Sequence, residues 1–182
     1  GIHAPTDTEY EWPWYNKLAG AWFLDHPSTP SNVQNGRFFV TKRNELTAGM
    51  PDSFERKDEF YSFKDISSKI NVVVKIDEKS YIGGKNGDDH PISWYHEFDG
   101  GRSFYTAMGH TDETYSEPIF LNHIYAGVVY AAGGVAPKPV DFTKSRPEEN
   151  RFTKVILEEK LDEPMELSLL DKDRVLFIQR KG

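Results

Sequence analysis

Residues 91–108 read PISWYHEFDGGRSFYTAM, and this stretch decides how the middle of the chain folds. Aromatic and β-branched residues dominate its two halves, and Asp99-Gly100-Gly101 separates them. Short turns of this composition join antiparallel strands. The stretch therefore predicts a hairpin with strands at residues 91–98 and 102–108.

The segments around this hairpin indicate a sheet with a helix packed on it. Residues 71–77 carry Val72-Val73-Val74 and Ile76, a pattern typical of a buried strand. Residues 118–132 begin with a proline, carry apolar side chains at spacings of three and four, and end before Gly133-Gly134, which predicts a helix. Further strands are predicted at residues 36–40 and 59–63, with a short helix at 13–18. The fold class is therefore α/β.

The end of the chain differs in composition from the rest. Residues 135–150 contain three prolines and six charged residues without an apolar period, which indicates a linker. Residues 151–182 are interpreted as a short β-rich tail, and about 30 residues cannot bury a core alone. We expect residues 1–134 to form one domain and the chain to be a fragment of a longer protein at both ends.

Composition narrows the classes of function. Lys and Arg number 22 and Asp and Glu number 29, a net charge of −7. Nucleic acids and anionic membranes both require a basic face, so neither is an expected partner. The chain has no cysteine, which excludes disulfides, thiolate metal sites and a cysteine nucleophile. Aromatic residues make up 14%, which favours a packed core or a surface that stacks on a neutral polar ligand.

Histidines at the ends of predicted elements are the first candidates for chemistry. His3 follows a short apolar segment, His110 follows the predicted hairpin, and His26 lies in a loop. In open α/β sheets the loops after the strands form the ligand crevice, so His3 and His110 are candidate general bases or metal ligands. The alternative is that each only closes a loop. His123 lies on the apolar stripe of the predicted helix and is expected in the core.

Carboxylate, basic and aromatic side chains complete the candidate site. Glu59 lies inside an aromatic strand and could orient a histidine, or be an ordinary edge-strand charge. Arg102 could hold a substrate oxygen, or pair with Glu97 or Asp99. The predicted catalytic residues are His3, His110 and Glu59. The predicted substrate-binding residues are Asp7, Trp12, Trp14, Tyr15, His26, Trp94, Arg102 and Tyr105.

Four stretches carry a resemblance to a known family. They are GIHAPTDTEYEWPWY at residues 1–15, DEFY at 58–61, HPISWYHE at 90–97 and GGRSFYT at 100–106, with Gly109-His110 following. Together they resemble the ThuA-like (trehalose utilisation) family. That family is similar to class I glutamine amidotransferases, which implies part of a flavodoxin-like three-layer sandwich lacking its first half. Gly1-Ile2-His3 stands where those enzymes have Gly-x-Cys, so without a thiolate glutaminase chemistry is excluded.

The tail carries a second resemblance. Residues 150–182 resemble the opening of a glucose/sorbosone dehydrogenase-like six-bladed propeller. Large secreted bacterial proteins join such a propeller to a ThuA-like domain. This implies contacts with a missing first half and with a downstream propeller, and a periplasmic or secreted protein; a cytoplasmic one is the alternative.

Three functions remain open at this point. The leading hypothesis is a carbohydrate-utilisation domain that acts on a sugar or keto-sugar by acid–base chemistry of the hydrolase, lyase or isomerase type. The second is a divalent-metal site built from His3, His26, His110 and Glu59, since imidazole and carboxylate suit zinc and similar ions. The third is a sugar-binding or scaffolding domain without activity.

Overall fold

The computed structural model describes residues 1–134, 138–139, 141, 160, 164–169 and 175–179. The chain divides into two compact units, Gly1–Ser145 and Arg146–Gly182. Most of the predicted linker at residues 135–150 lies outside the described residues, as does its boundary with the tail.

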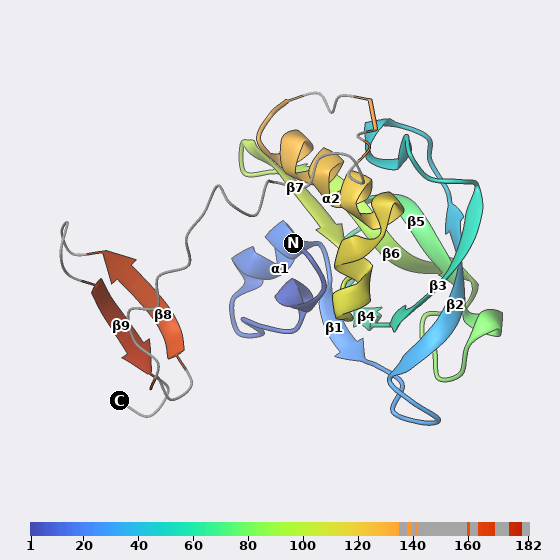
Figure 1. Ribbon diagram of the computed structural model, residues 1–182, viewed down its shortest axis with the longest axis horizontal. Helices are drawn as coiled ribbons and strands as arrows, with labels where there is room; N and C mark the ends of the chain where they lie inside the picture. The colour runs from blue at the N-terminus through green and yellow to red at the C-terminus, as the bar shows by residue number, and fades with distance from the viewer. Residues whose placement is uncertain (135–137, 140, 142–159, 161–163, 170–174, 180–182) are drawn as a thin grey trace. The chain divides into compact units, whose positions relative to one another are not determined.

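The first unit is built on a five-stranded sheet (Figure 1). All of its strand pairs are antiparallel. The strands, in their order across the sheet, are β3 (Ser53–Glu59), β2 (Val33–Val40), β5 (Asn71–Asp77), β6 (His90–Phe98) and β7 (Gly101–Thr106). Strands β1 (Trp22–Asp25) and β4 (Ser62–Lys64) form a separate antiparallel pair.

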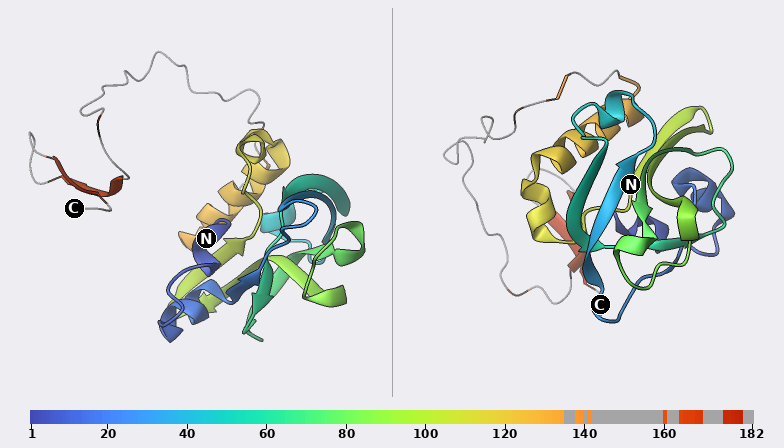
Figure 2. Two further views of the ribbon diagram at one scale, coloured as in Figure 1. Left: turned by 90° about the horizontal axis from the view of Figure 1, so that it is seen from below. Right: turned by 90° about the vertical axis from the view of Figure 1, so that its right-hand side faces the viewer.

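The α/β class is confirmed, but the order and direction of the strands differ from the resemblance to flavodoxin-like proteins. Such a fold has a parallel sheet, whereas the sheet here is antiparallel and curls round its own core (Figure 2). Among the described residues, the parallel pairing is a single bridge between Ile2 and Thr106, next to the end of β7. The connections explain the difference, because none of the segments between the neighbouring strands of this sheet contains an α-helix, and parallel strands need a crossover that usually contains one.

The predicted hairpin is confirmed as β6 and β7. Phe98 pairs with Gly101, and Ser93 pairs with Thr106. Asp99 and Gly100 both have positive φ, 52° and 76°, as the central residues of a type I′ turn require. Strand β7 therefore begins at the hairpin turn and ends at Thr106, which lies beside the start of the chain.

Two α-helices flank the sheet, and both were predicted. Helix α1 (Pro13–Ala19) ends at Gly20, whose left-handed φ of 94° closes it. Helix α2 (Pro118–Ala131) lies across the sheet against β7 (Figure 1). It approaches closely because Gly127 has no side chain: a Cβ there would lie 2.2 Å from Cδ1 of Phe104. The described residues of this unit also form five short 3-10 helices: η1 (Ala4–Thr6), η2 (Glu45–Thr47), η3 (Glu78–Ser80), η4 (Gly87–Asp89) and η5 (Asp112–Ser116).

The core lies between the curled sheet, α2 and the loops. Its fully buried large side chains include Phe38, Phe60, Trp94, Tyr105 and Phe120. The strand predicted at residues 71–77 is confirmed with its ends as β5. The strand predicted at residues 59–63 is wrong, because β3 ends at Glu59 and β4 begins at Ser62. Glu59 is therefore the last residue of a strand rather than the first.

The second unit contains a hairpin of strands β8 (Pro164–Leu169) and β9 (Val175–Gln179). The β-rich character of the tail is confirmed for these residues. No helix in the described parts of the chain has the length and apolar character needed to span a membrane.

Candidate functional site

His3 is held in a turn that an ordinary residue rarely adopts. Its backbone N–H donates to the carbonyl of Thr106 over 2.7 Å, and η1 begins directly after it. Its φ is 56° and its ψ is −96°, in the region that favours glycine. Such a conformation costs about 1–3 kcal/mol and persists where the surroundings impose it, often at functional sites. The chain thus turns sharply at His3 and presents the imidazole to the end of the sheet.

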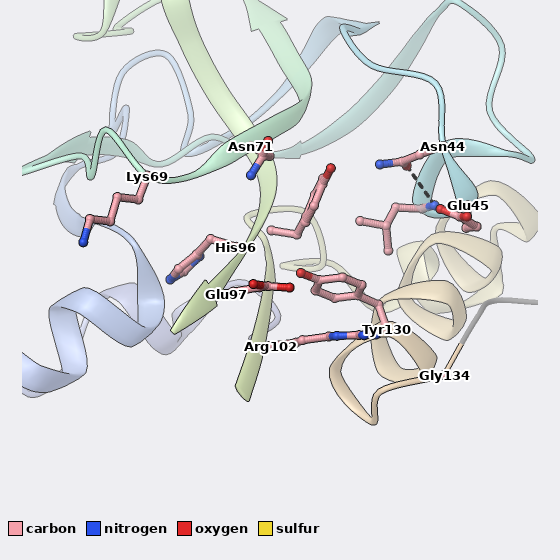
Figure 3. A pocket seen from close by; sticks show the side chains of 11 residues that line it. Asn44, Glu45, Lys69, Asn71, His96, Glu97, Arg102, Tyr130 and Gly134 are labelled. Atoms are coloured by element: carbon pink, nitrogen blue, oxygen red, sulfur yellow. Dashed lines mark hydrogen bonds between the residues drawn. The ribbon is translucent and has the colours of Figure 1, made fainter. Parts of the chain in front are cut away.

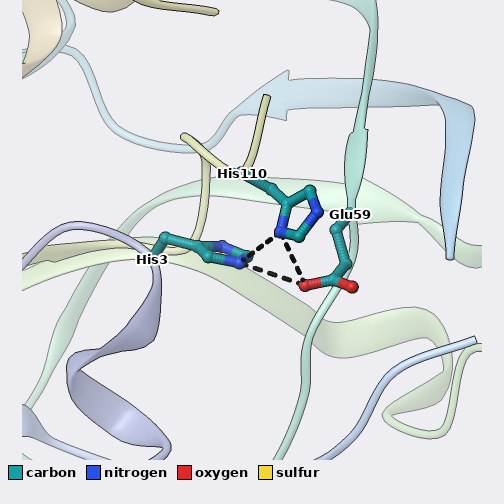
Figure 4. Close-up of side chains that lie close together, drawn as sticks. All are labelled: His3, Glu59 and His110. Carbon is teal, nitrogen blue, oxygen red and sulfur yellow. Dashed lines mark hydrogen bonds and ion pairs between the residues drawn. The ribbon is translucent and has the colours of Figure 1, made fainter. Parts of the chain in front are cut away.

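Three side chains from distant segments meet at this point. His3 Nε2 lies 3.1 Å from Glu59 Oε2, and His110 Nδ1 lies 3.1 Å from the same oxygen. His3 Nε2 and His110 Nδ1 are also 3.1 Å apart. Figure 4 shows the three side chains pointing toward one another from separate segments. The predicted convergence of His3, His110 and Glu59 is therefore confirmed, and we call this group the histidine–carboxylate triangle.

The groups around the triangle fix its orientation. His3 Nδ1 lies 2.8 Å from the carbonyl oxygen of Ala107, which can only accept, so Nδ1 carries a proton and donates it. The neutral His3 ring then presents a lone pair at Nε2. The second oxygen of Glu59 accepts from Nδ2 of Asn32 over 2.9 Å, and His26 Nδ1 lies 3.6 Å from that oxygen.

Asp58 positions the third corner of the triangle. Its buried carboxylate accepts from the backbone N–H groups of Glu59, Gly109 and His110 over 2.9–3.0 Å. It also pairs with Arg56 over 3.2 Å. The carboxylate therefore ties the loop that carries His110 to the end of β3. Sequence reasoning preferred Glu59 over its neighbour and missed this role, as it missed Asn32, for which the sequence holds no signal.

The aromatic rings of Tyr61 and His26 pack beside the triangle. The ring of Tyr61 lies 4.3 Å from that of His3 and stacks with that of His26 at 6.3 Å. Burial, with Glu59 and Asp7 adding to it, raises the pKa of Tyr61 to about 12. Asp7 accepts a 2.5 Å hydrogen bond from Tyr10. His26 and Asp7, two of the predicted substrate-binding residues, therefore lie beside Tyr61 and close to the triangle.

The predicted aromatic group of Trp12, Trp14 and Tyr15 continues through Trp22 to Tyr10 as a row of ring contacts, which we call the aromatic stripe. Trp12 stacks with Trp14 at 5.2 Å and with Tyr15 at 6.0 Å, and Tyr15 stacks with Trp22 at 6.3 Å. Trp22 in turn lies 5.2 Å from Tyr10, next to Asp7. The far end is tied to the hairpin turn, where Trp14 Nε1 donates to Asp99. Thr106, whose carbonyl accepts from the His3 N–H, lies about 16 Å from that turn along β7, so Trp14 is well separated from His3.

Comparison with known proteins agrees with this arrangement. The family model described as ThuA, trehalose utilisation, matches residues 1–131. The chain belongs to the ThuA family. The matched residues include the curled sheet and the turn at His3, and we call this part of the chain the ThuA domain. A search of curated proteins finds no match to the chain.

Two solved structures have a similar fold. A ThuA-like protein from Bacteroides uniformis superposes with a TM-score of 0.58 at 22% identity, over 75% of this chain and 60% of that one. A ThuA-like protein from Parabacteroides merdae gives 0.56 at 16% identity, over 75% and 61%. The chain therefore spans about 60% of the length of the solved ThuA-like proteins it matches.

Two of the predicted substrate-binding residues lie in the core of the ThuA domain instead. Trp94 is fully buried, and its Nε1 donates to the carbonyl of Ala19 over 2.8 Å. Tyr105 is 1% exposed, and its hydroxyl donates to the carbonyl of His3 over 2.6 Å. Burial raises the pKa of Tyr105, so the hydroxyl stays protonated. Tyr105 thus supports the turn at His3 rather than holding a sugar oxygen.

Arg102 lies in a different place from the triangle. Its guanidinium lies 5.4 Å from the ring centre of Tyr130, at the hairpin end of β7. There it lines an open cavity of about 590 Å³ together with His96, Glu97 and Lys69 (Figure 3). The prediction that Arg102 shares a ligand with His3 is therefore not supported by its position.

His123 is in the core, as predicted. It is 1% exposed, and its ring nitrogens contact the carbonyl of Leu46 and the hydroxyl of Ser93 at 2.7 and 2.8 Å. Burial lowers its pKa to about 4. The Ser93–His123 pair resembles a nucleophile and its base, but both residues are buried, so it is structural.

Proposed function

We propose that this ThuA domain acts on a sugar or keto-sugar at the histidine–carboxylate triangle, with His3 and His110 as acid and base. The observation that carries the proposal is the triangle itself, in which two imidazoles and one carboxylate lie within 3.1 Å of one another. The family's link to trehalose utilisation supports a carbohydrate as the substrate class.

The contacts around each residue support different roles. The Ala107 carbonyl holds His3 in the tautomer whose Nε2 can accept a proton. Glu59 lies between the two imidazoles and stabilises whichever of them is protonated. The side chain of His110 is 36% exposed and that of His3 11%, so His110 is the group that solvent or substrate reaches first. The pair suits reactions that move a proton, namely hydrolysis, elimination or isomerisation.

The aromatic stripe supports an extended substrate. Aromatic faces stack on the apolar faces of sugar rings. Trp12 and Trp14 are 50% and 39% exposed but lie at the hairpin end of β7, so one sugar ring cannot contact both them and His3. We propose that Tyr10, Tyr15, Trp12 and Trp14 bind further sugar units of a chain whose reacting end lies at His110.

The same exposed stripe favours a second candidate, a sugar-binding domain without turnover. The test is to assay trehalose, a longer glucan and their keto derivatives with the parent chain, His110→Asn, Trp12→Ala and the control Glu97→Gln. Loss of turnover with retained binding in His110→Asn supports the enzyme. Absence of turnover in the parent, with binding lost in Trp12→Ala and intact in His110→Asn, supports the binding domain.

We also propose a wider context for the domain. The parallel bridge between Ile2 and Thr106 supports a parallel strand beside β7, as in a flavodoxin-like three-layer sandwich. The hairpin of β8 and β9 and the tail's resemblance to a propeller support a multidomain bacterial protein that is periplasmic or secreted. A longer chain that contains both neighbouring regions would test this through its binding of sugar and its behaviour in cell fractionation.

A further inference from the structure

The histidine–carboxylate triangle has more lone pairs than it has protons to share. Each of its three 3.1 Å contacts needs one proton to be a hydrogen bond. The Nδ1 proton of His3 is already donated to Ala107, and an ionised Glu59 only accepts. With both rings neutral, His110 can supply one proton at Nδ1 for all three contacts. Two acceptor atoms then face each other without a hydrogen between them.

A cation at this point would satisfy all three atoms at once. Atoms at the corners of a triangle with 3.1 Å edges lie about 1.8 Å from its centre, so an ion about 1 Å above the plane would be about 2.1 Å from each. Zinc binds imidazole nitrogen and carboxylate oxygen at about 2.0–2.2 Å. We propose that His3 Nε2, Glu59 Oε2 and His110 Nδ1 bind a divalent transition-metal ion of the zinc class.

The surroundings of the triangle are those that metal ligands usually have. Ligating histidines donate their other ring N–H to a carbonyl or carboxylate, as His3 does to Ala107. Ligating carboxylates are hydrogen-bonded as well, as Glu59 is to Asn32. Asp58 fixes the backbone of His110, so all three donors are positioned before an ion arrives. His26 contacts the other oxygen of Glu59 and the carbonyl of Pro27, which makes it a supporting residue rather than a ligand.

The ligand set indicates both the kind of ion and the kind of site. Two imidazoles and one carboxylate suit zinc or iron(II), whereas calcium and magnesium prefer oxygen ligands alone. Three protein ligands leave coordination positions open, which is typical of catalytic rather than structural sites. The inference deepens the proposed function and rests on it for the role in catalysis. With an ion bound, neither His3 Nε2 nor His110 Nδ1 would be free to accept a proton, so an ion-bound water, with its pKa lowered toward about 7, would be the base in their place.

The test uses the whole 182-residue chain, stripped with a chelator and titrated with Zn²⁺ in a calorimeter. We expect one equivalent to bind with micromolar affinity or better, and a higher melting temperature that the chelator reverses. His110→Ala and Glu59→Gln are expected to weaken binding at least about tenfold. His96→Ala, which changes a histidine outside the triangle, is the matched control and is expected to bind as the parent does. Co²⁺ in place of Zn²⁺ should give a visible absorption spectrum that His110→Ala loses.

Binding of less than about 0.1 equivalent, or equal binding by the parent and His110→Ala, would overturn the metal site. Parallel titrations with trehalose and its keto derivative, with and without Zn²⁺, separate this proposal from the proposed function. Turnover that His110→Asn abolishes in a chain that binds no Zn²⁺ refutes the ion and supports the imidazole mechanism. If Zn²⁺ binds stoichiometrically but the sugars are neither bound nor turned over, the proposed function is refuted and the metal site is supported.

Discussion

The backbone strain at His3 can be measured with two variants, His3→Ala and His3→Gly. Both substitutions remove the imidazole and its contacts with Ala107 and Glu59. They differ in the Cβ atom alone, which the φ of 56° disfavours. The difference in unfolding free energy between the two variants therefore reports the backbone strain and not the lost contacts.

The expected difference follows from two opposing effects. Relief of strain at such a residue is worth about 1–3 kcal/mol in favour of glycine. The greater freedom of glycine in the unfolded chain opposes this by about 0.5–1 kcal/mol. We therefore expect His3→Gly to be more stable than His3→Ala by about 1 kcal/mol, the difference between the midpoints of these two ranges. Both variants are expected to lose sugar binding or turnover.

Urea unfolding followed by tryptophan fluorescence provides the assay, with one slope fitted to both variants. Val128 supplies the control pair, because it is 63% exposed in the interior of α2. There the sign reverses, and Val128→Gly should be less stable than Val128→Ala by about 1 kcal/mol. If the control pair behaves so while His3→Gly is no more stable than His3→Ala, the turn at His3 is not strained and the reasoning is wrong.

Three further predictions concern the site and the core. His110→Asn should change the unfolding free energy by no more than about 0.5 kcal/mol, because the side chain is 36% exposed, while calorimetry shows loss of sugar binding or assays show loss of turnover. Asp58→Asn should lower the unfolding free energy by about 1–3 kcal/mol in urea melts, because it removes the buried carboxylate that pairs with Arg56 and leaves the more exposed Glu117 as the charged partner of Arg56. Lowering the pH from 6.5 to 4 should reduce the free energy of unfolding by up to about 3 kcal/mol through His123. Burial lowers the pKa of His123 in the folded chain to about 4, so the unfolded chain binds a proton at this residue at a higher pH than the folded chain does. His123→Asn should make the urea midpoint depend less on pH in that window.

Each of these predictions has a clear contrary result. A large fall in melting temperature for His110→Asn would assign His110 a structural role. An Asp58→Asn variant as stable as the parent would show that Arg56 finds other partners, such as Glu117, which lies 3.4 Å away. An unchanged pH dependence in His123→Asn would mean that the acid sensitivity belongs to another buried group, of which His90, whose pKa burial also lowers, is the first to test.

Local pattern in the sequence determined the elements of the sheet and its helix. The turn at Asp99-Gly100 specifies a hairpin because Gly tolerates positive φ and Asp tolerates it better than most residues. The apolar period of residues 118–132 specifies α2, and the valine run specifies β5. Such signals depend on neighbours within a few residues, so a sequence suffices to find them. The rule that ligands gather at strand ends selected His3 and His110, whereas Glu59 was selected because it was expected inside an aromatic strand.

The tertiary structure alone decided which strands pair and what surrounds the triangle. Glu59 is 56 residues from His3, and His110 is 107 residues from it, so no local pattern encodes their 3.1 Å contacts. Asn32 and Asp58 orient the triangle through contacts with residues far away in the sequence, which no pattern of neighbouring residues encodes. Alternation along a strand shows which residues share a face, but it does not show which face becomes the core. Trp94 and Tyr105 were therefore predicted at a ligand surface, whereas the structure buries both. Arg102 and His3 are separated because they lie at opposite ends of the paired segment formed by β7, a consequence of register that only the folded sheet determines.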